Sequence, residues 1–299
     1  MVIFLIFSVP MSEFKVSVII PVYNAEKYLR NAVESAVALE EVGEIILIED
    51  RSPDNAFQIC LQLEKQYEKV TVYTHPNRDN RGAGESRNLG ISKSSFEYIA
   101  FLDADDWYLP HRFKRCKELL LNNEFNDGVY EATGYYYEAT QQQDSSRLTT
   151  IKNDISPSNL LFTLLGTEGG RFHTNAITLR KSILEKSGLF DTSLRLHQDT
   201  HLWLRIAHVG VLVAGEATKA VAVRRVHDQN RIQHFNEKSR KLLFIKTFEW
   251  FEKQNNVSKK SYRIIFNRYA ASLNENLFTR LLFTLLYLAR HPRNFKKLI

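Results

Sequence analysis

A short apolar run that ends in three carboxylates constrains the fold of this chain more than any other feature. Tyr98 to Leu102 form the run, and Asp103, Asp105 and Asp106 follow it. The pattern predicts a buried strand that delivers acids to the C-terminal edge of a sheet, where open α/β sheets bind ligands. Side chains two apart in an extended segment point the same way, so we expect Asp103 and Asp105 to face one site.

Two neighbouring carboxylates repel each other unless a cation lies between them. Hard, oxygen-ligated ions such as Mg²⁺ or Mn²⁺ suit such a pair, above all when they also hold the diphosphate of a substrate. For the Asp-x-Asp pattern alone, a solvated acidic turn after a strand is the alternative interpretation. Other motifs of the chain are therefore needed to distinguish a metal site from a solvated turn.

Strand and helix patterns alternate through the first third of the chain. Apolar runs predict buried strands at Val16–Val22, Glu44–Ile48 and Val70–Tyr73, and apolar residues at helical spacing from Tyr28 to Val37 predict a helix between the first two. This alternation indicates a mostly parallel α/β sheet with right-handed crossovers. The Gln-, Ser- and Thr-rich stretch Thr140–Thr150 is expected to be a loop.

Polar residues at strand and helix ends are the candidate ligand contacts. Glu49 or Asp50, after the second strand, could accept the N–H of a nucleobase, and Arg87 could pair with a phosphate, although capping and a surface ion pair are alternatives. Asp199 lies at a predicted helix N-terminus, where the dipole favours its ionised form, but it could be only a cap. His227 is either a metal ligand or a surface histidine. The chain has no Gly-x-Gly-x-x-Gly or P-loop motif, which argues against a Rossmann dehydrogenase and a P-loop NTPase.

The end of the chain is basic. Residues 236–299 hold 14 Lys and Arg against 4 Asp and Glu, in a chain of net charge +6. Such a region is typical of contact with an anionic surface, and a solvated basic helical face is the alternative. Two or three helices are expected here. Leu277–Ala289 is apolar on nearly all sides but too short to span a bilayer, so we favour a helix packed on the rest of the fold with a basic rim that touches membrane.

The N-terminal residues and the two cysteines do not indicate a function. Residues 1–11 are apolar, are too short to span a bilayer and lack the basic start of a signal peptide, so we interpret them as an extension from a misassigned start, with Met11 as the true start. Cys60 and Cys116 are too few for a disulfide framework and show no metal-ligand spacing. Nothing in the sequence demands an oxidising compartment.

Taken together, these segments resemble the family-2 glycosyltransferases of the GT-A fold. The resemblance covers about residues 15–230 and rests on five motifs in the order typical of that family. The first motif is the strand and turn at Val16–Asn24. Glu49–Asp54 is similar to the D-D-G-S-x-D segment of the family, and Gly82–Gly90 is similar to its G-x-x-x-A-R-N-x-G segment. Asp103–Asp105 matches the D-x-D, and Gln198–Arg205 is similar to the E-D-x-x-L-x-x-R segment at a helix start. Each motif is weak alone, but five in this order are specific.

The resemblance implies a nucleotide pocket. Its lining would be Pro21, Tyr23, Glu49 and Asp50, with Asp50 as the partner of a uracil-type base, and Arg87 would approach the nucleotide.

The resemblance also implies the reacting groups. Asp103 would face the ribose or the metal, Asp105 would bind Mg²⁺ or Mn²⁺ directly, and Asp199 would be the catalytic base. His227 would lie near the diphosphate, as a second metal ligand.

The implied protein is an inverting glycosyltransferase of hexosyl or N-acetylhexosaminyl type. It would move a sugar from a nucleoside-diphosphate sugar, with UDP-sugar as the first choice, to a hydroxyl of a glycan or lipid-linked glycan. We expect a catalytic domain at 12–234 and a basic helical region at 235–299. We also expect a cytoplasmic location, with peripheral contact at the inner face of the membrane, and no nucleic-acid partner because no aromatic-basic recognition motif is present.

Three departures from the family pattern leave the donor open. Glu49 replaces the first Asp, so a longer arm must reach the base, and Arg51 replaces a Gly that would reach positive φ easily. Gln198 replaces a Glu, but Asp199 is retained. The alternatives are a catalytically degenerate nucleotide-sugar or carbohydrate binding protein of the same fold and a nucleotidyltransferase, whose Gly-rich basic signature after the first strand is absent.

Overall fold

The computed structural model describes residues 13–151, 155–166, 170–228, 237–273, 276–291, 294 and 298. The N-terminal extension interpreted at residues 1–11 therefore lies outside the described residues.

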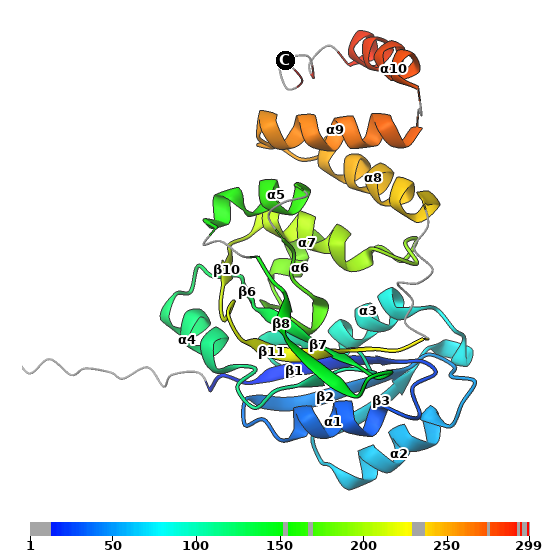
Figure 1. Cartoon of the computed structure of the whole chain (residues 1–299), viewed down its shortest axis with the longest axis vertical. Coiled ribbons are helices and arrows are strands. Elements are labelled where there is room, and N and C mark those ends of the chain that lie inside the picture. Colours follow the sequence, from blue (N-terminus) through cyan, green and yellow to red (C-terminus); the bar gives the residue numbers. More distant parts are fainter. Residues whose placement is uncertain are drawn as a thin grey trace, which may run out of the picture.

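A seven-stranded, mostly parallel sheet forms the centre of the molecule (Figure 1). Its spatial order is β10-β6-β9-β4-β1-β2-β3, and β9 is antiparallel to both of its neighbours. The strands are β1 (Val16–Val22), β2 (Val42–Glu49), β3 (Val70–Thr74), β4 (Tyr98–Phe101), β6 (Gly128–Tyr130), β9 (Ile177–Arg180) and β10 (Leu212–Ala214). This topology confirms the predicted mixed α/β sheet, and its parallel part follows from strands that are apolar on both faces.

A smaller sheet of four strands runs in the order β5-β11-β7-β8. Its strands are β5 (Trp107–Tyr108), β7 (Ala132–Tyr137), β8 (Gln142–Thr149) and β11 (Ala220–Val226). The expectation of a loop at Thr140–Thr150 was wrong, because β8 pairs antiparallel with β7. As an edge strand with largely exposed polar residues, β8 lacks the alternation of apolar side chains that marks a strand in a sequence.

Helices cover both faces of the large sheet, and a separate buried cluster lies under each set. One set is α1 (Leu29–Val37), α2 (Ala56–Gln66) and α4 (Lys114–Asn122); the other is α3 (Ala83–Lys93), α5 (Pro157–Leu165), α6 (Ile183–Ser187) and α7 (Gln198–Val209). In α1 the buried residues are Leu29, Ala32, Val33 and Ala36, the stripe that its sequence predicts. Cys60 and Cys116 are both buried and unpaired.

Three helices, α8 (Glu237–Glu252), α9 (Lys259–Leu273) and α10 (Leu277–Arg290), stand at one end of the molecule (Figure 1). The cluster under α7 continues into α8 and α9, where it includes Phe251 and Phe266. Tyr287 of α10 packs on Phe266, but Leu281 and Leu285 on its other side are 58% and 66% exposed. α8 and α9 therefore pack on the rest of the fold, whereas α10, the helix for which such packing was expected from the sequence, is buried on one side only.

None of the helices in the described ranges is long and apolar enough to cross a bilayer.

Candidate active site

A cavity of about 890 Å³ collects most of the predicted site residues. It opens where β1 and β4 end, beside the start of α7, and α8 and α9 form part of its wall. Its lining includes seven of the nine predicted site residues: Pro21, Tyr23, Arg87, Asp103, Asp105, Asp199 and His227. The carboxyl ends of parallel strands meet at one edge of a sheet, which is why residues so far apart in sequence converge here.

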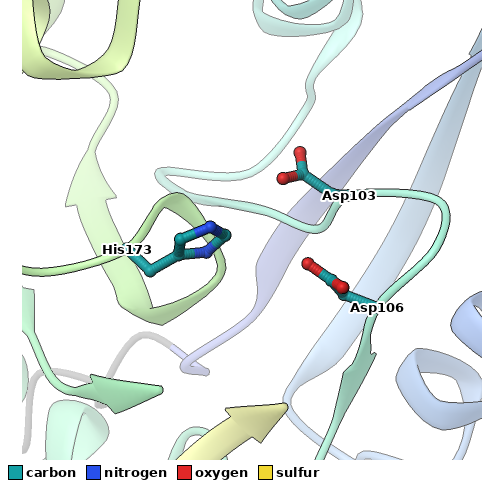
Figure 2. Close-up of side chains that lie close together, drawn as sticks. All are labelled: Asp103, Asp106 and His173. Atoms are coloured by element: carbon teal, nitrogen blue, oxygen red, sulfur yellow. The ribbon is translucent and has the colours of Figure 1, made fainter. Parts of the chain in front are cut away.

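The acidic segment after β4 is a turn and not the extended segment expected from sequence. The Asp106 N–H donates to the Asp103 carbonyl at 3.0 Å. The turn brings Asp103 and Asp106 together, so the two-residue geometry inferred for Asp103 and Asp105 does not hold, although Asp105 also lines the cavity. Figure 2 shows Asp103, Asp106 and His173 pointing toward one another, and their ligand atoms lie within 4.8 Å of each other.

Asn175 holds this turn in place. Its side-chain oxygen accepts from the Asp103 N–H at 3.0 Å, and its amide nitrogen donates to Asp106 at 2.6 Å. The Arg225 N–H donates to the other Asp106 oxygen at 2.7 Å. Burial, together with the charges of Asp105 and Asp103, raises the pKa of Asp106 well above its usual range. A divalent cation beside these carboxylates would reverse that effect by favouring their ionised forms.

Asp105 and His227 form a second pair in the same cavity. The His227 Nε2 lies 2.9 Å from an Asp105 oxygen. Two neighbouring ligands of an octahedral ion with bonds of about 2.1 Å also lie about 3 Å apart, so this spacing suits a shared ion as well as a hydrogen bond. Burial lowers the pKa of His173, which keeps that ring neutral and able to ligate. Carboxylate oxygens suit both Mg²⁺ and Mn²⁺, so the aspartates of the two groups fit the expected ions.

Arg87 is buried between the acidic turn and an aromatic ring. Its guanidinium donates to Asp103 at 2.6 Å and lies over the Phe190 ring at 5.5 Å. Among the described residues its Nε–H has no hydrogen-bond partner. Because a buried donor without a partner costs free energy, an anionic ligand in the cavity is a natural partner for it.

Glu49 and Asp50 lie outside the lining of the cavity, unlike the other predicted residues. Asp50 is 2% exposed, and its carboxylate accepts the backbone N–H groups of Arg81 and Gly82 at 2.6 and 2.8 Å. Glu49 accepts from the Ser52 N–H and lies 3.5 Å from Arg78. Both acids shape the loops around the cavity, and their contact with a base stays a prediction.

Asp199 is the second residue of α7, close to the position predicted for it. Its oxygens accept from the Thr200 N–H at 2.7 Å and from the Thr174 hydroxyl at 3.5 Å. The side chain is half-buried and lines the cavity. The residue before it, Gln198, is buried against Gly84 of α3, where an added Cβ would lie 2.5 Å from the Gln198 side-chain oxygen. That glycine lets the start of α7 approach α3 closely.

The site combines acids that follow β4 and could hold a divalent cation with a further carboxylate at the start of α7, an arrangement that suits a glycosyltransferase. The family profile described as "Glycosyl transferase family 2" matches residues 17–186, and the chain belongs to that family.

Two curated relatives illustrate the match. An uncharacterized glycosyltransferase of Rickettsia typhi is 32% identical over 222 residues, which are 71% of this chain and 64% of that protein. The minor teichoic acid biosynthesis protein GgaA of Bacillus subtilis is 28% identical over 223 residues, or 67% of this chain and 46% of that protein. The chain thus spans only part of the length of these relatives.

Solved structures agree on the fold. Residues 1–349 of S. aureus TarS in complex with UDP superpose with a TM-score of 0.62 at 16% identity, covering 87% of this chain and 71% of that chain. The mannosyltransferase PcManGT from Pyrobaculum calidifontis, in complex with GDP-Man and Mn²⁺, gives 0.59 at 15% identity, covering 92% and 80%.

Three residues of the site, Asp106, His173 and Asn175, were not predicted from the sequence. Asp106 was noted beside the D-x-D, but the extended geometry assumed there favoured Asp105. His173 and Asn175 lie around a short 3₁₀ turn, Thr174–Ala176, where no periodic pattern marks them. The wall formed by α8 and α9 was also missed, because that region lies beyond the five motifs.

Proposed function

We propose that this protein transfers a sugar from a nucleoside-diphosphate sugar, with UDP-sugar as the first choice, to a hydroxyl of a glycan or lipid-linked glycan, with inversion. The observation that carries the proposal is the meeting of the acidic turn, Arg87 and Asp199 in one cavity of a family-2 fold. Solved relatives of the same fold hold UDP, UDP-GlcNAc or GDP-Man, which supports a nucleotide donor of hexosyl or N-acetylhexosaminyl type.

Each side chain has a part in this reaction. Asp103, Asp105, Asp106 and the two histidines are the candidate holders of Mg²⁺ or Mn²⁺, which when bound neutralises charge on the leaving diphosphate. Arg87 pairs with a phosphate. Asp199 accepts the proton of the acceptor hydroxyl as that oxygen forms a bond to the anomeric carbon and the bond to the diphosphate breaks. Attack from the opposite face inverts the anomeric centre.

Recognition of a uracil-type base by Asp50 is the finer part of the proposal. A carboxylate has about four acceptor positions, and Asp50 uses two of them on the loop at Arg81 and Gly82. Asp50 is 2% exposed and lies outside the lining of the cavity, so contact with the base requires that this loop opens toward the cavity.

The Asp105→Ala variant is expected to lose metal-dependent donor binding. We would titrate UDP-glucose, UDP-galactose, UDP-N-acetylglucosamine and a GDP-sugar by calorimetry, with and without Mn²⁺. One donor should bind only with metal, and the variant should bind it at least about tenfold more weakly, because a charge-assisted contact is lost. Asp144→Ala, at a carboxylate of the edge strand β8 that does not line the cavity, is the matched control.

The two histidines separate the two metal arrangements. His227→Gln should weaken Mn²⁺ dependence if Asp105 and His227 share the ion, and His173→Gln should do so if the ion sits in the group of Figure 2. Failure of every donor to bind in the presence of metal would contradict the catalytic proposal and favour a degenerate binding protein.

We further propose that α10 touches an anionic membrane and places the enzyme at its inner, cytoplasmic face. Leu281, Leu282, Leu285 and Leu286 are 48–66% exposed on one side of this helix. Arg280 and Arg290 flank the leucines, and no acidic residue occurs between Leu277 and Arg290. An apolar stripe with only positive charges around it is complementary to anionic lipid headgroups over acyl chains.

Vesicle sedimentation tests this contact. The protein should bind vesicles that contain phosphatidylglycerol more strongly than pure phosphatidylcholine vesicles. The variant Leu281→Gln/Leu285→Gln should bind the anionic vesicles at least about tenfold more weakly, because two leucines that insert into the membrane are lost. Phe125→Gln, at a side chain 75% exposed between α4 and β6, should bind as the wild type does. Equal binding of the double variant, or no binding to anionic vesicles, would refute the membrane contact.

A further inference from the structure

Five arginines line the cavity in addition to Arg87. They are Arg171, Arg195, Arg224, Arg240 and Arg268. In the ranges that the structure describes, none of the five forms an ion pair with a carboxylate within 4.0 Å, whereas Arg87 is paired with Asp103. Cations gathered in a cavity without carboxylate partners are a recurrent arrangement for binding phosphate, because a guanidinium matches two phosphate oxygens.

Arg240 and Arg268 come from the C-terminal helices. Arg240 lies in the first turns of α8 and Arg268 in the second half of α9, and the two helices pack through Phe248, whose ring stacks on Tyr269 at 4.2 Å. Arg268 lies over the Phe244 ring at 5.2 Å, and Phe244 also lines the cavity. The aromatic ring fixes the guanidinium at the wall.

Arg268 is half-buried, and the partial loss of water around its charged guanidinium costs free energy. Burial, with the charge of Arg240 as the second cause, lowers its pKa. A partly desolvated cation beside another cation is stabilised when an anion binds between them. The wall therefore favours a negatively charged ligand.

Asp199 stands between this wall and the metal-binding turn. On one side Thr174, next to His173, donates to an Asp199 oxygen. On the other side His197, two residues before Asp199, has its ring nitrogen 3.5 Å from the hydroxyl of Ser239, the neighbour of Arg240. A donor diphosphate belongs with the acidic turn and Arg87, so the α8–α9 wall is left for the molecule whose hydroxyl Asp199 deprotonates.

We propose that the acceptor carries a phosphate group close to its attacking hydroxyl, and that Arg240 and Arg268 bind this phosphate, with Arg171 at the rim of the cavity. The inference rests on the proposed function, since it takes Asp199 as the base. The same chemistry has two sources: a phosphodiester or phosphomonoester on a soluble polyol or glycan, and the diphosphate of a lipid-linked acceptor.

Calorimetric titration with charged and uncharged probes tests the acceptor site. The probes are glycerol 3-phosphate against glycerol, and geranyl diphosphate against geraniol, each added to the protein with Mn²⁺ and UDP and to the protein alone. The variant is Arg240→Gln/Arg268→Gln, which keeps the apolar stems. Arg263→Gln, an exposed arginine of α9 outside the cavity, is the control. Thermal melts of both variants verify folding.

At least one phosphorylated probe should bind where its uncharged counterpart does not, and the double variant should bind it about 10- to 100-fold more weakly, because one or two charge-assisted contacts are lost. Binding of geranyl diphosphate alone would assign the lipid-linked source, and binding of glycerol 3-phosphate would assign the soluble one. UDP binding should be unchanged in the double variant.

Two results would overturn the proposal. The first is equal affinity of the double variant and Arg263→Gln for the phosphorylated probe. The second is a loss of UDP binding in the double variant, which would show that these arginines bind the donor. If the wild type bound no nucleotide at all, the proposed function would fail, and with it the acceptor role, even where the phosphorylated probe still bound.

Discussion

Asp199→Asn is expected to reduce the rate of sugar transfer by about 10²- to 10⁴-fold, the usual contribution of a positioned general base. Asparagine has nearly the same shape. Its side-chain oxygen can still accept from the Thr200 N–H, and its amide nitrogen, in the place of the second carboxylate oxygen, can donate to the Thr174 hydroxyl, so the start of α7 should keep its conformation. It cannot take the proton of an acceptor hydroxyl. Donor affinity should change little, because the donor contacts that we propose lie on the acidic turn and Arg87.

Single-turnover assays with the donor identified by calorimetry would measure this effect, alongside donor titrations of the same variant. Asp144→Asn, on the exposed edge strand β8, provides a carboxylate-to-amide control outside the cavity. A wild-type rate for Asp199→Asn would show that this carboxylate only caps the first turn of α7, the alternative that the sequence leaves open.

Arg112→Met is expected to destabilise the fold by about 3–5 kcal/mol, the range found when one partner of a buried ion pair is removed. Arg112 is fully buried. Its guanidinium donates to Glu131 at 2.8 Å and to the carbonyls of Asn175 and Ile177 at 2.9 and 3.0 Å. Without it, the carboxylate of Glu131 remains buried without its cationic partner, and the turn at Asp103 and Asp106 loses an anchor at Asn175.

The loss should grow with pH. Burial already raises the pKa of Glu131 from 4.5 to about 7, with Arg112 opposing the shift, and removal of the arginine raises it further. A carboxyl group whose pKa is higher in the folded state binds its proton more tightly there, so its stabilising effect is present below 4.5 and is lost as pH rises through the folded value. Arg112→Met should therefore be more destabilised at pH 8 than at pH 5.

Urea unfolding followed by circular dichroism at both pH values would measure this difference. Arg112→Met/Glu131→Gln should recover part of the lost stability and remove most of its pH dependence, since no buried charge remains. A single variant with wild-type stability at both pH values would contradict the assigned role of the pair.

The central sheet could be predicted because its physical signals are local. β1, β2 and β4 are short apolar runs, and the burial of both faces of a parallel sheet requires such runs. The edge where Asp103 and Asp105 lie also follows from strand order, since the carboxyl ends of parallel strands share one side. Asp199 reaches the same cavity from the start of α7.

The finer geometry of the site depends on contacts that leave no pattern in the sequence. Asp106 joins Asp103 because of a turn that Asn175, 69 residues further along, holds by a hydrogen bond. Asp50 lies beneath the cavity because two backbone N–H groups from another loop capture its carboxylate. The spacing of residues within one segment does not indicate which residues of a distant segment they will contact.

The buried cluster that runs from α7 into α8 and α9 makes the cooperative folding unit longer than residues 17–186, where the family match lies. During synthesis, the part of α7 that packs on α8 has no cover until α8 has left the ribosome. The C-terminal helices α8 and α9 therefore complete both the buried core around α7 and the wall of the cavity that Asp199 also lines. Loss of packing between α8 and α9 should therefore disturb the wall of the cavity together with the core.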